Sequence, residues 1–345
     1  MKKRKVYMGS VLLVLLLGIV IVYAASVGTA NLSAGDSLTL ILNRIPVLKN
    51  LVNATEISGV YDTIIWKVRL PRVLLSALVG GALGVVGAAF QGIFKNPLAD
   101  PYVLGVSSGA ALGATIAMMF GIQINMAGLG GVGAAAFLCA LLTVFCIYQV
   151  SHIGGIPSMS NMLLAGTAIS TLLSAMMSLL ITFHQNSLEK VYMWTLGSFN
   201  AATWSKVKFL SIFLLIGGMI LCFFAEELNL LMTGEDTAKS LGVSIKQVRI
   251  IIIVTASLLV AAAVSVSGVI GFVGLVIPHC VRLIFGADYK HLLPLSILSG
   301  AIFTVFCDTI ARTIAAPTEI PVGVITSIFG APFFLYLLFK NRKKK

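Results

Sequence analysis

The sequence predicts an all-α, polytopic membrane protein with about ten transmembrane helices. Of its 345 residues, 58% are hydrophobic and only 10% are charged, and the mean hydropathy is +1.02. A soluble domain has about 45–50% apolar and about 25% charged residues. This composition excludes a soluble enzyme, a disordered chain, a fibrous repeat and a secreted disulfide scaffold. The apolar runs are continuous rather than alternating, so helices rather than outer-membrane strands are expected.

Basic residues at both ends set the expected topology. The net charge is +12, and much of it lies in residues 2–5 and 342–345. In a soluble protein this charge would suggest nucleic acid, but beside apolar spans it marks the cytoplasmic side. Two cytoplasmic ends require an even number of spans. We therefore expect a multi-pass membrane protein with both termini on the cytoplasmic side and no nucleic-acid partner.

Each span is a run long enough to cross the bilayer, which takes about 20 residues. The expected spans are 6–27, 70–92, 100–120, 127–150, 160–182, 207–225, 247–267, 269–285, 294–312 and 321–340. The first could be read as a cleaved signal peptide, but its apolar run reaches Ala25, which favours an uncleaved helix. Small residues at positions 80, 84, 88 and 92 predict close helix packing.

The sequence gives little support for a metal site or for disulfide bonds. The five cysteines lie in apolar runs without a CxxC pair. His279 follows Pro278 inside a span, with no second ligand at metal-binding spacing. We expect no metal site.

Arginines gather at the expected external side. Arg69 and Arg72 flank Pro71, which suits a first helical turn. Because a helix N-terminus disfavours cations, an external carboxylate would explain them, and Arg312 ends the ninth span on the same side. The alternatives are arginines that extend to the lipid headgroups and an Asp308–Arg312 pair within one helix.

A helix break follows the second span. Residues 95–101, KNPLADP, contain two prolines, and Gly and Ser follow at 105–109. Such backbone is tolerated at membrane depth only beside a cavity. Residues 105–109 also match the G-x-S-x-G pattern of a nucleophilic serine. A hydrolase that uses Ser107 or Ser108 is therefore an alternative, although the pattern requires a preceding strand.

The longest inner polar stretch, residues 226–249, predicts a short capped helix. Thr233 to Asp236 has capping-box form, Gly242 suits a C-terminal cap, and Ser244 to Gln247 forms a second capping box. Apolar residues on such a helix suit insertion into a partner's groove. The alternative is an ordinary structured loop.

Taken together, these segments resemble the permease subunit of FecCD-type ABC importers, which take up ferric siderophores, haem or vitamin B12. The resemblance runs from about residue 60 to the C-terminus. It is strongest in residues 69–110 (RLPRVLLSALVGG…), 228–243 (LNLLMTGEDTAKSLGV), 271–283 (GFVGLVIPHCVRL) and 308–338 (DTIARTIAAPTEIPVG…).

The resemblance implies a bundle like the vitamin B12 permease (type II ABC importer), with residues 1–345 as one transmembrane permease domain. It implies a second permease copy or paralogue, two cytosolic ATPase subunits and an extracytoplasmic substrate-binding protein. Binding-protein docking maps to Arg69, Arg72 and Arg312. The cytoplasmic coupling segment, residues 226–246, would seat in the ATPase through Leu231, Thr233, Gly234, Glu235, Asp236, Ala238, Leu241 and Gly242. The translocation path and gate map to Asn96, Leu98, Ser158, Met159 and Ser160; Met159 is bulkier than the threonine expected there.

The resemblance and the residues imply the same mechanism. The chain has no GxxxxGK[ST] phosphate-binding loop, so we expect no enzymatic activity of its own, and ATP and Mg²⁺ would bind the partner. The expected cargo is a ferric siderophore, with haem or cobalamin as the alternative. An ion-coupled secondary transporter is a remote alternative, because intramembrane acids are usual there, and the mid-chain candidates here are Asp100 and Asp308, both near span ends.

Overall fold

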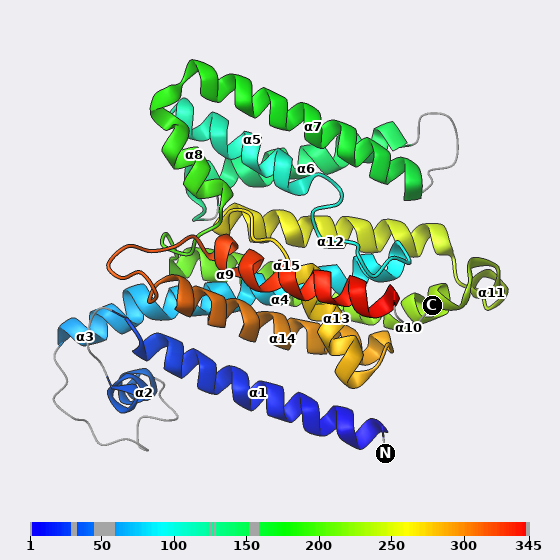
Figure 1. Cartoon of the computed structure of the whole chain (residues 1–345), viewed down its shortest axis with the longest axis horizontal. Coiled ribbons are helices and arrows are strands. Elements are labelled where there is room, and N and C mark those ends of the chain that lie inside the picture. Colours follow the sequence, from blue (N-terminus) through cyan, green and yellow to red (C-terminus); the bar gives the residue numbers. More distant parts are fainter. Residues whose placement is uncertain are drawn as a thin grey trace.

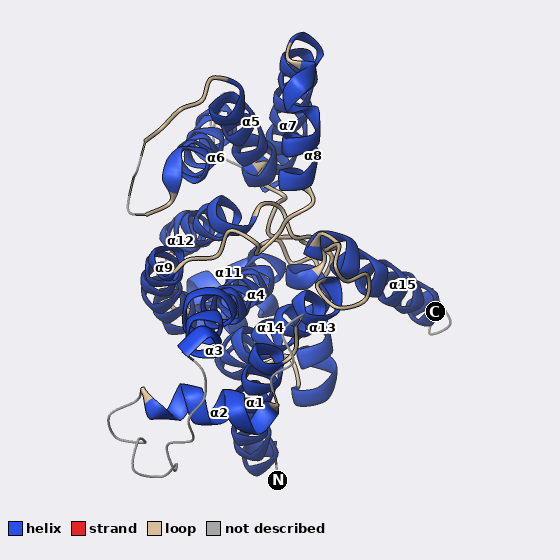
Figure 2. Ribbon diagram, turned by 90° about the vertical axis from the view of Figure 1, so that its left-hand side faces the viewer, coloured by secondary structure: helices blue, strands red, loops and turns tan. Residues whose placement is uncertain are grey.

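The structure is a computed structural model that describes residues 2–28, 33–44, 59–124, 126, 128–151 and 159–342. Within these ranges the regular elements are all helical (Figure 2). The helices are α1 (Lys2–Ser26), α2 (Ala34–Asn43), α3 (Gly59–Thr63), the π-helical η2 (Ile64–Arg69), α4 (Leu70–Ile93), α5 (Val106–Met119), α6 (Gly130–Ser151), α7 (Met159–Phe183), the 3₁₀ turn η3 (Gln185–Ser187), α8 (Leu188–Thr195), α9 (Trp204–Phe223), α10 (Ala225–Thr233), α11 (Glu235–Ser240), α12 (Ile245–Ser267), α13 (Val273–Phe285), α14 (Tyr289–Ala311) and α15 (Val322–Arg342).

The described chain contains seven helices that are long and apolar enough to cross a membrane, and α5, α13 and α15 supply three shorter apolar helices. Together they account for all ten predicted spans, so the prediction of a helical membrane bundle is confirmed. Several boundaries differ by a few residues. α5 begins at Val106 rather than residue 100, and α13 begins at Val273 rather than residue 269, whereas α14 begins earlier, at Tyr289 rather than residue 294. Before α5 and α13 irregular backbone replaces the first helical turns; before α5, Pro97 and Pro101 disfavour a helix.

The long helices run roughly side by side, which gives the bundle two ends (Figure 1). The start of α1, the end of α15 and the short helix α11 lie at one end, which we call the terminal end. Helices α2, α3 and α8 lie at the other, which we call the opposite end. This arrangement agrees with the predicted even number of spans.

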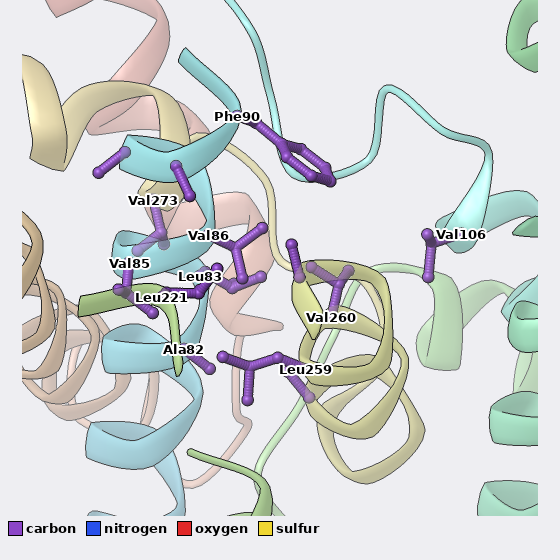
Figure 3. Close-up of a cluster of buried hydrophobic side chains, with 14 of the residues drawn as sticks. Ala82, Leu83, Val85, Val86, Phe90, Val106, Leu221, Leu259, Val260 and Val273 are labelled. Carbon is purple, nitrogen blue, oxygen red and sulfur yellow. The ribbon is translucent and has the colours of Figure 1, made fainter. Parts of the chain in front are cut away.

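Helix α4 is the centre of the bundle, and 89% of its apolar span is buried. It packs against α14, α13, α9 and α12. Its side chains Leu83 and Val86 meet Leu259 and Val260 of α12 in the core (Figure 3). On another face, a Cβ on Gly80 or Gly84 would collide with the backbone of α14. The small residues of α4 therefore serve helix packing, as predicted.

We expect Gly84→Ala to lower the melting temperature of the purified chain. The added Cβ would lie 2.4 Å from the carbonyl oxygen of Ser296, and backbone cannot move aside as a flexible side chain can. Overpacking of this kind costs about 1–3 kcal/mol. Gly18→Ala on α1 is the matched control, because its Cβ would meet nothing within 4 Å. Equal melting temperatures for the two variants would contradict the close packing of α4 on α14.

Candidate functional site

A buried carboxylate at the opposite end of the bundle holds two arginines. Asp308 of α14 is 1% exposed. Arg72, in the first turn of α4, donates to Asp308 through Nε at 3.1 Å to both oxygens and through Nη2 at 2.8 Å. Its Nη1 donates to Glu319 at 2.9 Å. Arg312 lies farther away, with Nε 3.8 Å from Asp308 Oδ2. The predicted Asp308–Arg312 pair exists, but Arg72 is the stronger partner of Asp308.

The other two arginines hold the end of α1. Arg69 donates through Nη1 to the carbonyls of Ala25 at 3.1 Å and Ser26 at 2.6 Å. Arg312 donates to the carbonyl of Val27 at 2.7 Å and to that of Ala24. The last carbonyls of a helix have no partner within it and attract cations. Arg69 and Arg312 therefore satisfy the C-terminus of α1.

The sequence correctly placed Arg69, Arg72 and Arg312 at one end of the bundle, and the structure brings them together. All three make contacts within the chain, and Arg69 and Arg312 are buried. Their docking role stays a prediction. Sequence reasoning missed the bonds to α1 and to Glu319, because no local pattern links residues more than 40 positions apart.

Irregular backbone between the spans forms a second cluster, in which the α4–α5 loop meets the α12–α13 loop. The hydroxyl of Tyr102 donates to the carbonyl of Ile270 at 3.0 Å and accepts from its N–H at 3.1 Å. Gln91 of α4 donates weakly to Gly274 and Leu275 of α13. These bonds pair backbone groups that no helix satisfies. Tyr102 therefore joins the two loops.

We expect Tyr102→Phe to destabilise the fold by about 1–3 kcal/mol, because both backbone groups of Ile270 would lose a buried partner. Hydrogen exchange at residues 268–272 should rise in this variant. Tyr192→Phe on α8 is the control, since Tyr192 is exposed. Unchanged exchange and stability in Tyr102→Phe would show that these bonds do not hold the loops together.

The predicted gate residues lie near the terminal end where the structure describes them. Asn96 accepts from the N–H of Leu98 at 2.9 Å, and both residues are exposed. Met159 begins α7 and is half-buried, whereas Ser160 is exposed. Ser158 lies outside the described residues. The gate role of this set stays a prediction.

The G-x-S-x-G segment does not have the geometry of a nucleophilic serine. Gly105 is the left-handed N-cap of α5, with φ 67°, and Ser107 and Ser108 lie in the first helical turn. Residues 101–104 form turns rather than a strand. The strand-to-helix turn that exposes such a serine is therefore missing from this segment.

The coupling segment, residues 226–246, folds as two short helices, α10 and α11, at the terminal end. Leu228, Leu231 and Ala238 are buried beneath them, whereas Met232 is 50% and Leu241 is 61% exposed. Gly234, with φ 132°, makes the corner between the helices. The segment therefore presents apolar side chains away from the bundle on a well-anchored base.

The structure tests the two caps that the sequence predicts for α11, one at each end of the helix. Gly242, with φ 87°, donates to the carbonyl of Lys239, and Val243 donates to that of Ala238. This is the Schellman pattern, so the predicted C-terminal cap is confirmed. The predicted capping box at Thr233 is wrong. The Thr233 hydroxyl instead donates to the carbonyl of Leu230 within α10, and Gly234 is the N-cap of α11.

The second predicted capping box is half right. Ser244 is the N-cap of α12, but its hydroxyl donates to the side chain of Gln247 rather than accepting a backbone N–H.

An ion pair of 2.5 Å joins Glu235 of α11 to Arg249 of α12. This hydrogen bond lowers the pKa of Glu235, and the nearby charge of Lys95 acts in the same direction. Glu235 therefore stays ionised at neutral pH.

The coupling segment and the α4–α5 loop border one cavity of about 490 Å³. It is lined by Gln91, Lys95, Pro97, Asn229, Met232, Arg282, Ala287, Asp288 and Tyr289. Asn229 of α10 donates to Asp288 at 2.8 Å and accepts from the N–H of Tyr289 at 3.0 Å. A movement of α10 would therefore reach both the start of α14 and the predicted gate loop.

Comparison with known proteins places this geometry in a family. The model of the FecCD transport family matches residues 14–340. The uncharacterized ABC transporter permease protein YvrB of Bacillus subtilis is 45% identical over 82% of this chain and 80% of its own length. The cobalamin import system permease protein BtuC of Halobacterium salinarum is 42% identical over 81% of this chain and 75% of its own.

A solved structure shares the whole architecture. It is described as an inward-facing conformation of a putative metal-chelate type ABC transporter. It has 34% sequence identity and a TM-score of 0.83, and the match covers 96% of this chain and 98% of that one. With the ten apolar helices of its described residues and the family match over most of its length, the chain belongs to the FecCD transport family, whose relatives here are permease proteins of ABC transporters.

Proposed function

We propose that this chain is the permease subunit of an ABC importer that carries a ferric siderophore across the bacterial cytoplasmic membrane, driven by ATP hydrolysis on partner subunits. The main support for this proposal is that the helices α10 and α11 expose Met232 and Leu241 at the end of the bundle where both termini lie. The basic residues at 2–5, 340 and 342–345 support a cytoplasmic location for that end. Two cytosolic ATPases, which would bind ATP and Mg²⁺, would seat on α10–α11 of the two permease copies.

Helix α7 supports a second permease copy. Only 6% of its span is buried, although it is 25 residues long. Its start carries Met159 and Ser160, two of the predicted gate residues. If a second copy covers α7, these residues approach a shared axis, and the path runs between the copies.

The substrate-binding protein would dock at the opposite end, over the arginines. Arg72 and Glu319 are the members of that cluster with side chains still reached by solvent, at 12% and 35% exposure. An acidic side chain of the binding protein would replace Glu319 on Arg72. The bonds of Arg69 and Arg312 to α1 would hold the platform in place.

We expect Arg72→Gln to weaken binding of the substrate-binding protein at least about tenfold, whereas Glu319→Gln retains or strengthens it because a competing carboxylate is gone. Affinity is measured on the assembled importer in nanodiscs, with the melting temperature recorded in parallel. Unchanged affinity in a stable Arg72→Gln protein would remove Arg72 from the docking surface.

A metal chelate is the cargo class that the relatives support most broadly. Relatives 41% and 36% identical are named for hemin and Fe(3+)-citrate, and the solved relative is described as of metal-chelate type. A relative named for molybdate, which is a metal oxyanion rather than a chelate, is 37% identical. Haem and cobalamin remain alternatives within the class, since the hemin and cobalamin relatives are 41% and 42% identical.

The test is uptake by proteoliposomes that contain the chain, its ATPase and its binding protein. Labelled ferric siderophore, haem, cobalamin and molybdate are compared with ATP and with a non-hydrolysable analogue. We expect ATP-dependent uptake of the ferric siderophore above the others. A preference for another cargo would overturn the siderophore assignment, and uptake driven by an ion gradient alone would overturn the importer class.

A further inference from the structure

A large apolar groove opens beside α1 at the terminal end. Its volume is about 930 Å³, and α1 and the end of α13 form its walls. The two helices touch at Gly9, where a Cβ would lie 2.2 Å from the ring of Phe285. The lining consists of Arg4, Lys5, Tyr7, Met8, Gly9, Val11, Leu12, Leu15, Ile284 and Phe285.

The lining combines apolar walls with positive charge at one end. Leu12 is 66% exposed, and Tyr7, Met8 and Leu15 are likewise uncovered by the described chain. Arg4 and Lys5 are exposed and form no ion pair with any described residue. The lining contains no acidic side chain. The cations lie just before the span, at the level where headgroups meet water, and Tyr7 is of the residue type enriched at that boundary.

We propose that this groove binds one anionic phospholipid of the leaflet at the terminal end. Arg4 and Lys5 hold the phosphate, and an acyl chain lies along Met8, Leu12 and Leu15 against Ile284 and Phe285. The volume lies within the range of about 300–1,000 Å³ for ligand pockets. A second protein helix would gain little there, because helix interfaces in membranes are enriched in small residues, whereas the α1 wall of the groove carries Met8, Leu12 and Leu15.

The selectivity comes from the two cations. Each Lys or Arg near a membrane surface favours anionic lipid by about 1 kcal/mol. Two such residues without a counter-charge therefore predict a preference of about thirtyfold for an anionic over a zwitterionic headgroup. The bound lipid would fill the gap between α1 and α13 that the chain itself leaves open.

A tryptophan in the groove measures this preference in the full chain. Met8→Trp places an indole among the lining residues, while Trp66, Trp194 and Trp204 lie in or next to η2, α8 and the start of α9, toward the opposite end. The protein is reconstituted in phosphatidylcholine with increasing amounts of phosphatidylglycerol or phosphatidylcholine brominated on the acyl chains. Quenching of the parent chain is subtracted. We expect phosphatidylglycerol to quench the introduced indole at about thirtyfold lower mole fraction than phosphatidylcholine does.

Matched charge variants separate the groove from the general positive charge of this end. Arg4→Gln/Lys5→Gln should equalise the two lipids, whereas Lys239→Gln/Lys246→Gln, which removes the same charge outside the groove, should keep the preference. Equal quenching by the two lipids in Met8→Trp, or a preference that survives Arg4→Gln/Lys5→Gln, would overturn the proposal. The proposal would also be overturned if neither lipid quenched the indole and if Cys substitutions at Leu12 crosslinked two copies of the chain. A second copy would then occupy the groove.

Discussion

Changing Met232 and Leu241 together to aspartate is expected to abolish ATP-driven uptake. Both side chains are exposed on α10–α11 and would be buried in the groove of the ATPase. Burying a side chain of this size contributes about 1.5–3 kcal/mol. Losing both should weaken the interface by at least about 3 kcal/mol, or more than about a hundredfold in affinity. Co-purification of the ATPase and ATP-dependent uptake in proteoliposomes measure the loss.

Gln247→Glu is the control for added negative charge, because Gln247 is exposed at the start of α12 just beyond the coupling segment. It should keep the ATPase bound. The melting temperature of the isolated permease should not fall in either variant, since none of the three residues is buried. An ATPase that still co-purifies with the aspartate variant would refute the coupling role of α10–α11.

Asp308→Asn is expected to cause the largest loss of stability of any single change at the opposite end. The substitution would leave the partly buried guanidinium group of Arg72 and the buried one of Arg312 without their shared counter-charge. Removing one partner of a buried ion pair costs about 3–5 kcal/mol, against a total stability of about 5–15 kcal/mol for a folded protein. The yield of folded protein and its melting temperature measure the effect.

Glu319→Gln supplies the comparison, because Glu319 contacts the same arginine but is 35% exposed. An exposed pair of this kind contributes about 0–1 kcal/mol, so this variant should remain close to the parent in stability. If both variants melt alike, Asp308 is not the buried centre of the arginine cluster.

Local signals predicted the fold well. The spans follow from runs of apolar residues, and the end of α11 follows from Gly242, whose φ of 87° favours glycine. The prediction for Thr233 was wrong because its hydroxyl has two local hydrogen-bonding options. It can cap the N-terminus of α11 or donate to the carbonyl of Leu230 in α10, and in the structure it donates to Leu230.

The candidate site was predictable only in part. Arg69, Arg72 and Arg312 were placed at the same end because span order and charge determine sidedness. Their partners were not predictable, since Arg72 and Asp308 are 236 positions apart and only the packing of α4 on α14 brings them together. Asp308 and Arg312 are four residues apart, one helical turn. The Asp308–Arg312 contact was therefore predictable from the sequence, although it is weaker than the Arg72–Asp308 contact.

The central claim is that ATP hydrolysis on a partner subunit drives transport through this chain. Uptake measured with an active and with an inactive ATPase tests that claim most directly. Proteoliposomes are loaded with the same ATP and contain the permease with its binding protein and either the wild-type ATPase, a variant that binds but does not hydrolyse ATP, or no ATPase. We expect the labelled metal chelate to be taken up only with the wild-type ATPase. Equal uptake in all three preparations would contradict that mechanism.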